Sequence, residues 1–183
     1  IRGGSAGDSG AALREHAGYV NGAPTPQAAD LVRVGLAGTL GDYALTGADG
    51  TLQPLREFKY GGQPAGYAAQ PGEVVNYVEN HDNQTLWDID AWRLPPGTPS
   101  AERARVQLLG AALTAFSQGI AYFHAGIDVL RSKSLDRNSF DSGDWFNRLD
   151  WSYQGNNFGV GLPPQKDNGS DWEAMKPLLD DPT

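Results

Sequence analysis

The sequence predicts an α/β fold with parallel strands, and three segments carry this prediction. Residues 74–78 form a nearly continuous, valine-rich apolar run, which is typical of a strand covered on both faces. Residues 98–117 have the periodicity of a helix, and residues 120–123 form a second short apolar strand. A strand, a helix and a strand at this spacing make a right-handed βαβ unit, in which the two strands are parallel.

Polar residues follow the first of these strands directly. Pro71 and Gly72 mark the start of the strand, and residues 79–88 then read Glu-Asn-His-Asp-Asn-Gln-Thr-Leu-Trp-Asp. The adjacent His81 and Asp82 are therefore expected at the carboxyl end of a buried parallel strand. In α/β barrels, ligands bind and chemistry takes place at this end.

An earlier helix is predicted to begin at Pro26. Thr25 is a suitable N-cap, and proline suits the first helical position. Apolar and small residues continue the pattern over 31–38, and Gly41 is expected to end the helix. Residues 45–66 are interrupted by several glycines, which predicts an irregular segment before the first strand.

The second helix follows a proline turn at residues 94–97, and Thr98-Pro99-Ser100 is its expected start. Charged side chains occupy its first turns, and we interpret them as a solvated face rather than a site; they are Glu102, Arg103 and Arg105. Its apolar residues recur at helical spacing; they include Val106, Leu109, Leu113 and Phe116.

Two further segments lack clear periodicity. Residues 127–172 are polar and aromatic, and loops of this length within a domain are usually functional or disordered; the aromatic residues favour an ordered, substrate-side loop. A last helix is expected at 171–179.

Residues 1–22 form a Gly-rich loop. Within it, residues 3–7 fit the G-x-S-x-G pattern and residues 7–10 resemble a serine-protease nucleophile loop, but both patterns need flanking structure that the sequence does not predict. His16 is expected to face solvent.

Composition narrows the classes of function. The 183 residues are enough to form a hydrophobic core, and we interpret residues 1–183 as a single segment. The net charge of −8 argues against nucleic acid or an anionic membrane as partner. The absence of cysteine excludes a disulfide, a thiol nucleophile and a cysteine metal site. No apolar run is long enough for a transmembrane helix.

Residues 77–88 (Tyr-Val-Glu-Asn-His-Asp-Asn-Gln-Thr-Leu-Trp-Asp) resemble the last conserved region of the α-amylase superfamily of glycoside hydrolases. More narrowly, they resemble its pullulanase and limit-dextrinase branch. A second match agrees in order and separation: residues 130–134 (Leu-Arg-Ser-Lys-Ser), followed by residues 141–148 (Asp-Ser-Gly-Asp-Trp-Phe-Asn-Arg). The region that resembles the family spans most of the chain from about the first helix onward.

The resemblance implies a partial (β/α)8 TIM barrel made of its later βα units, because a complete barrel has about 250 residues. It also implies a retaining hydrolase of α-1,6 branch linkages in pullulan, starch or glycogen-derived dextrins, with an α-glucan and the rest of the parent barrel as partners. Asp82 would be the transition-state stabiliser, and His81 would bind the same sugar. The nucleophile and general acid have no match here, so the segment alone is expected to be inactive.

Further substrate-binding candidates follow from the same resemblance. Asn83 and Trp87 come directly after the central pair, although Trp87 is an equally good core residue. In the long loop the candidates are Arg137, Asn138, Asp144 and Trp145. The family often has aspartate where Asn138 stands, which removes a charge at that position. A structural corner is the alternative interpretation for Asp144 and Trp145.

No His, Cys or carboxylate cluster has metal-ligand spacing and the sequence identifies no definite cofactor, although the acidic loop over 136–144 is a candidate for calcium. Localisation stays open, and analogy slightly favours a secreted or cell-surface enzyme. Three alternative functions remain: another glucanase of the superfamily, a non-catalytic glycan-binding or structural fragment, and a serine hydrolase based on the N-terminal Gly/Ser patterns.

Overall fold

The structure, a computed structural model, describes residues 25–180. The serine-hydrolase patterns and His16 lie outside these residues. The α-helices are α2 (Pro26–Leu36), α3 (Leu86–Arg93), α4 (Ser100–Phe116), α5 (Asp144–Asn147), α6 (Gln165–Asn168) and α7 (Trp172–Leu179). The strands are β1 (Ala44–Thr46), β2 (Leu52–Pro54), β3 (Lys59–Tyr60), β4 (Gln63–Pro64), β5 (Val75–Asn76) and β6 (Ile120–Ala121). Short 3-10 turns, η1 (Leu55–Glu57) to η5 (Gly169–Asp171), connect them.

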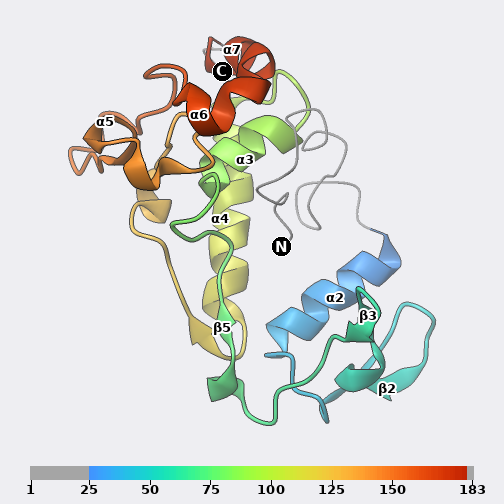
Figure 1. The fold of residues 1–183 in the computed structure, drawn as a ribbon. Coiled ribbons are helices and arrows are strands. Elements are labelled where there is room, and N and C mark those ends of the chain that lie inside the picture. Colours follow the sequence, from blue (N-terminus) through green and yellow to red (C-terminus); the bar gives the residue numbers. More distant parts are fainter. Residues whose placement is uncertain (1–24, 181–183) are drawn as a thin grey trace.

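The parallel strand pairing of the predicted βαβ unit is confirmed. β5 pairs in parallel with β6, with Val75 opposite Ile120 and Asn76 opposite Ala121. The long helix α4 runs between them along the chain and stands behind β5 in the molecule (Figure 1). The carboxyl ends of the two strands therefore point the same way, toward the segments that follow them.

The burial predicted for these strands is wrong. Val74 is 5% exposed, but Val75 and Ile120 are 52% and 51% exposed. Within residues 25–180, β5 and β6 form a sheet of two strands. No further strand in that part of the chain pairs with either of them. The apolar sequence that suggested a central strand is here an uncovered apolar surface, to which Tyr77 and Phe123 also contribute.

Helix α2 begins as predicted. The Thr25 hydroxyl accepts a hydrogen bond from the Ala28 N–H at 3.1 Å, as an N-cap does. The helix ends at Leu36 and does not reach Gly41. The chain turns at Gly38, whose φ of 69° lies in the left-handed region that glycine adopts freely.

Helix α4 has the predicted length, but its buried side is polar. Its buried residues are Arg103, Gln107, Gly110 and Thr114, whereas Leu108 and Phe116 are 69% and 81% exposed. The prediction that all its N-terminal charges are solvated is wrong for Arg103, whose guanidinium carbon lies 4.5 Å from the centre of the Trp87 ring. Glu102 and Arg105 do form an exposed ion pair at 3.1 Å.

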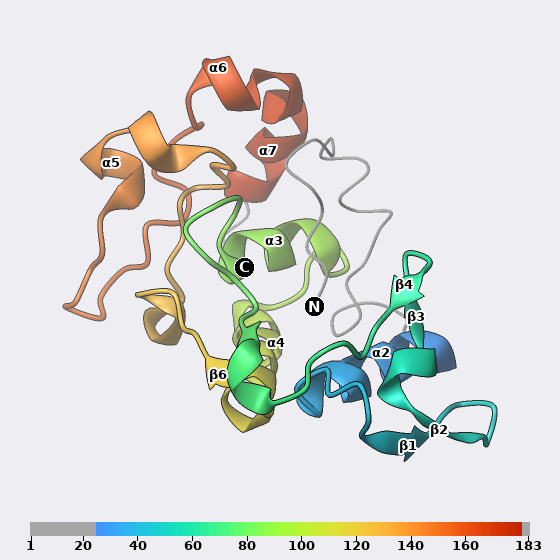
Figure 2. The same ribbon diagram turned by 60° about the horizontal axis from the view of Figure 1, so that its bottom comes forward.

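Helix α3 was not predicted, and it lies at the centre of the larger apolar core. Thr85 caps it by accepting a hydrogen bond from the Asp88 N–H. The core cluster consists of Leu86, Ile89, Trp92, Leu135 and Met175. It joins α3 to the long loop and to α7, which lie together at one end of α4 (Figure 2).

A second, smaller cluster packs α2 against the segment that follows it, with Val34, Leu55 and Phe58 buried. In that segment the predicted irregular chain contains two short antiparallel pairs, β1 with β2 and β3 with β4. The last helix, α7, is confirmed. In residues 25–180 no helix has the length and apolar character that would let it cross a membrane.

Candidate functional site

The His81–Asp82 pair lies in a tight turn just beyond β5. The Asp82 N–H donates to the Asn80 side-chain oxygen at 2.8 Å, and Asn83 adopts a left-handed φ of 59°. His81 Nδ1 and Asp82 Oδ1 are 3.2 Å apart, and these side chains are 78% and 71% exposed. The turn therefore presents an imidazole and a carboxylate side by side to solvent.

Glu79 closes this turn from inside the protein. One of its carboxylate oxygens accepts the Leu86 N–H at the start of α3. The other lies 3.0 Å from His124 Nδ1, where the chain leaves β6. The Glu79 and His124 side chains are only 2% and 11% exposed. One buried carboxylate thus ties the ends of the turn together and joins it to the neighbouring strand.

Arg131 extends this contact into the long loop. Its Nη1 lies 3.3 Å from His124 Nε2, and its Nη2 donates to the Asn147 carbonyl at 2.6 Å. Burial lowers the pKa of the Arg131 guanidinium from its ordinary value, and the Glu79 carboxylate opposes the shift. Glu79, His124 and Arg131 form a row of charged and polar groups beneath the turn.

Asp88, on α3, forms a second buried centre. It accepts hydrogen bonds from the Ser132 hydroxyl at 2.5 Å and from the Lys133 N–H at 2.8 Å. Complete burial raises the pKa of Asp88 from 3.8 to about 6, although these hydrogen bonds act in the opposite direction. This carboxylate holds the start of the long loop against α3.

The Lys133 side chain returns from this loop to the His81–Asp82 turn. Its Nζ donates to the His81 carbonyl at 3.1 Å, and the residue is 1% exposed. Burial lowers the pKa of the Lys133 ammonium from its ordinary value, while the Asp88 and Asp136 carboxylates oppose the shift. The His81 carbonyl of the turn is therefore hydrogen-bonded to a buried lysine.

The loop candidates Arg137 and Asn138 make polar contacts within the protein. The Arg137 Nε donates to the Asp167 carbonyl at 2.7 Å, and its Nη1 lies 3.8 Å from Asp171. The Asn138 N–H donates to Asp136 at 2.9 Å. The arginine thus fastens the loop to α6 and η5, and its side chain keeps 22% exposure.

The remaining candidates divide into exposed and buried residues. Asp144 and Trp145 begin α5; Asp144 is exposed, and Trp145 is 59% exposed, with its indole N–H donating to the Val160 carbonyl at 3.2 Å. Asn83 is partly buried. Trp87 is 5% exposed and lies under Arg103, which favours the alternative that it is a core residue.

Two carboxylates of the acidic loop proposed for calcium, Asp136 and Asp141, accept from protein donors, whereas Asp144 is exposed. Asp136 accepts hydrogen bonds from the Ser142 hydroxyl at 2.6 Å and the Asn168 amide at 3.0 Å. Asp141 pairs with Lys166 at 3.1 Å. Within the part of the chain that the structure describes, no group of three His, Asp or Glu side chains has the arrangement of a metal site.

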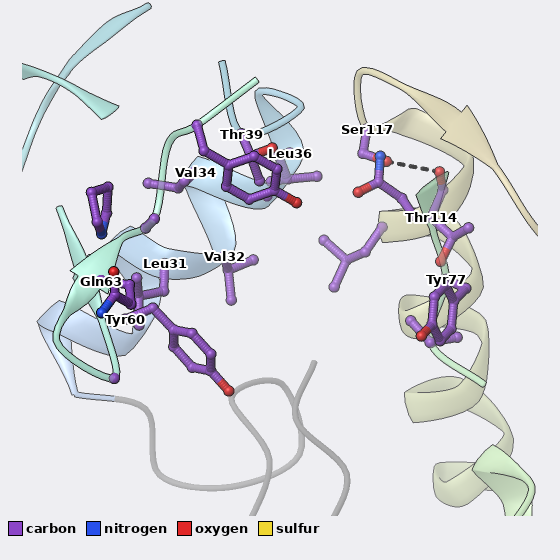
Figure 3. A pocket seen from close by; sticks show the side chains of 18 residues that line it. Leu31, Val32, Val34, Leu36, Thr39, Tyr60, Gln63, Tyr77, Thr114 and Ser117 are labelled. Atoms are coloured by element: carbon purple, nitrogen blue, oxygen red, sulfur yellow. Dashed lines mark hydrogen bonds between the residues drawn. The ribbon is translucent and has the colours of Figure 1, made fainter. Parts of the chain in front are cut away.

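A cavity of about 620 Å³ lies apart from the His81–Asp82 turn, between α2 and the C-terminal half of α4 (Figure 3). Apolar side chains of α2 line one wall and Tyr77 and Thr114 line the other, with Tyr60 and Tyr67 also contributing. Neither His81 nor Asp82 lines this cavity, so volume alone does not identify the predicted site.

Sequence reasoning did not assign roles to Glu79, Asp88, His124 and Lys133. Glu79, Asp88 and Lys133 lie within the two matched motifs, which was the available signal. Their roles depend on contacts between residues up to 52 positions apart, and no local pattern reveals such contacts.

Comparisons with known proteins show which family this chain is similar to. A family model described as "Alpha-1,6-glucosidases, pullulanase-type, C-terminal" matches residues 153–183. A pullulanase of Klebsiella pneumoniae is 45% identical over 188 residues, covering 96% of this chain and 17% of that protein. The chloroplastic pullulanase 1 of Arabidopsis thaliana is 47% identical over 153 residues, covering 83% and 16%.

Solved structures give the same result. A crystal structure of Klebsiella pneumoniae pullulanase complexed with maltotriose matches with a TM-score of 0.91 and 43% identity, covering 97% of this chain and 18% of that chain. The apo form of the enzyme matches equally well, with 21% of that chain covered. The present chain therefore spans about a fifth of the length of these relatives.

Proposed function

We infer that this chain, a member of the pullulanase family, is part of an enzyme that hydrolyses α-1,6-glucosidic linkages in pullulan, starch or glycogen-derived dextrins. The relatives that cover nearly the whole chain are pullulanases, and one of their structures holds maltotriose. The exposed His81–Asp82 pair is the feature of this chain that fits a neutral sugar ligand, since its carboxylate and imidazole can pair with hydroxyl groups.

We further propose that the chain contributes the later βα units of a (β/α)8 barrel. The parallel pairing of β5 with β6 supports this arrangement. The exposure of Val75 and Ile120 also fits it, because apolar surfaces of this kind are usually covered by a partner. The remaining strands, and hence the cover, would come from the rest of the parent chain.

In the proposed mechanism, Asp82 stabilises the oxocarbenium-like transition state and His81 donates a hydrogen bond to the same sugar. Retention requires a carboxylate nucleophile and a carboxylic acid on either side of the bond. We assign both to other parts of the parent barrel. Asp82 accelerates the reaction only if its bonds to the sugar are stronger in the transition state than in the ground state.

The single observation that carries this proposal is the exposure of the His81 and Asp82 side chains on a turn whose backbone is held from inside. The test uses the full-length parent enzyme with pullulan as substrate. We expect Asp82→Ala to lower kcat by about a thousandfold, the loss typical of removing one electrostatic group of an active site. Products with intact α-1,4 bonds distinguish a pullulanase from another glucanase of the superfamily.

The 183-residue chain alone is expected to release no product from pullulan, and clear turnover would contradict the assignment of nucleophile and acid elsewhere. Titration of the same chain with maltotriose, with Asp82→Ala as the matched variant, tests the binding role separately. Binding that depends on Asp82 while the full-length enzyme shows no hydrolysis would favour a non-catalytic glycan-binding module.

A further inference from the structure

We propose that Lys133 is a positioning residue that fixes the His81–Asp82 turn for the substrate, an inference that rests on the function proposed above. The Lys133 ammonium donates to the His81 carbonyl at 3.1 Å, and the side chain is buried. It therefore acts on the backbone of the turn and not on the sugar.

The exposed side chains need such a support. His81 and Asp82 are 78% and 71% exposed, so packing does not fix their direction and the backbone of the turn must do so. A hydrogen bond from an ammonium group is stronger than one between neutral groups, and it gains further strength where water is excluded.

Lys133 is itself held from the opposite side. Its own N–H donates to Asp88 at 2.8 Å, and the hydroxyl of its neighbour Ser132 donates to the same carboxylate. The next two residues, Ser134 and Leu135, adopt left-handed φ values of 52° and 67°. The lysine thus extends from a tightly folded segment anchored on α3.

This anchoring connects the two parts of the predicted sugar site. Residues 132–134 lead directly into the loop that carries Arg137 and Asn138, while the Lys133 side chain holds the turn that carries Asp82. Both parts therefore share α3 as a common support. A displacement of about 1 Å at a reacting centre is enough to cost about a hundredfold in rate, so the rigidity of this connection should appear in kcat.

The test is Lys133→Met in the full-length enzyme, assayed on pullulan, because methionine keeps the apolar stem and removes the ammonium. We expect kcat to fall about tenfold or more and KM to change by less than about threefold. Lys166→Met is the matched control; Lys166 is an exposed lysine of α6 that pairs with Asp141, and its replacement should leave kcat unchanged. An unchanged kcat in folded Lys133→Met would overturn the proposal.

A double-variant cycle separates positioning from general destabilisation. If Lys133 acts through the turn, Lys133→Met should lower the residual kcat by less than about threefold in a variant that lacks both sugar-binding side chains of the turn, His81→Ala combined with Asp82→Ala. A full, additive loss in that background would overturn the positioning role. If Lys133→Met does not fold, Lys133→Gln takes its place in both experiments, with the same criteria. If instead Asp82→Ala keeps normal kcat, the proposed function itself fails.

Discussion

Glu79 Oε1 lies 3.0 Å from His124 Nδ1, and this contact joins the carboxyl ends of β5 and β6. The same carboxylate accepts the first N–H of α3. The His81–Asp82 turn lies between these two contacts along the chain, so its ends are fixed by a residue whose side chain is buried. The support of the candidate site is therefore buried and polar, and the proposed recognition surface is exposed.

The first prediction concerns this support. Glu79→Ala leaves His124 and the Leu86 N–H without their buried acceptor, so we expect the free energy of unfolding to fall by about 2–4 kcal/mol. Glu102→Ala removes an exposed carboxylate whose ion pair with Arg105 is solvated, and it should change stability by less than about 0.5 kcal/mol. Urea unfolding followed by tryptophan fluorescence measures both, and equal effects would contradict the role assigned to Glu79.

The second prediction is a pH dependence that arises from Asp88. Its pKa is about 6 in the folded protein against an ordinary value of 3.8, so between these values the folded state binds the proton and the unfolded state does not. The contribution of Asp88 to the free energy of unfolding is therefore greatest at low pH, and it is lost as pH rises from about 4 to 6. The shift corresponds to about 3 kcal/mol.

Asp88→Asn removes this titration. The variant also changes two hydrogen bonds, so its stability at any single pH is not the test. The quantity to measure is the difference in unfolding free energy between wild type and variant at pH 4.5, 5.5, 6.5 and 7.5. We expect that difference to change by about 1–3 kcal/mol across this range in favour of the variant. A constant difference would show that Asp88 titrates normally.

Local signals in the sequence predicted some elements well and others not. The Thr25 cap of α2 and the parallel pairing of β5 with β6 depend on neighbouring residues or on a simple strand–helix–strand order, so they could be predicted. Helix α3 was missed because its pattern is apolar on several sides and contains Asp88 and Asp90, which are both fully buried. Such burial is set by distant partners such as Ser132.

In the candidate site, too, some features could be predicted from the sequence and others could not. The first matched motif led to His81 and Asp82, and the structure places both on one exposed turn. The motifs carried no information on which charges are buried. Arg103 and Lys133 are therefore the instructive cases, because lysine and arginine are seldom fully buried and only the fold shows what surrounds them.

The third prediction tests the buried end of α4. The Arg103 guanidinium lies over Trp87, and its carbon is also 5.2 Å from the centre of the Phe158 ring. Arg103→Ala removes this cation–π contact and the packing of the side-chain stem, so it should destabilise the protein by about 2 kcal/mol. Arg105→Ala, two residues later on the exposed side, should cost less than about 0.5 kcal/mol. Comparable losses in urea unfolding would show that Arg103 is solvated.

The last prediction concerns Gly126, which lies between His124 and Arg131 with a φ of 97°. A Cβ atom there would lie 2.5 Å from Leu149 Cδ2 and 2.8 Å from Arg131 Cβ. Gly126→Ala therefore combines left-handed strain of about 1–2 kcal/mol with overpacking of about 1–3 kcal/mol. It would also displace the arginine that contacts His124, so full-length Gly126→Ala should lose activity on pullulan as well as stability.

Gly97→Ala separates these two effects. Gly97 also has a left-handed φ, 76°, but a Cβ atom there meets nothing within 4 Å. Its replacement should show the strain alone, a loss of about 1–2 kcal/mol, and should leave kcat on pullulan unchanged. Equal stability losses for the two variants would mean that the space around Gly126 can adjust, because the strain is common to both and only the contacts with Leu149 and Arg131 differ.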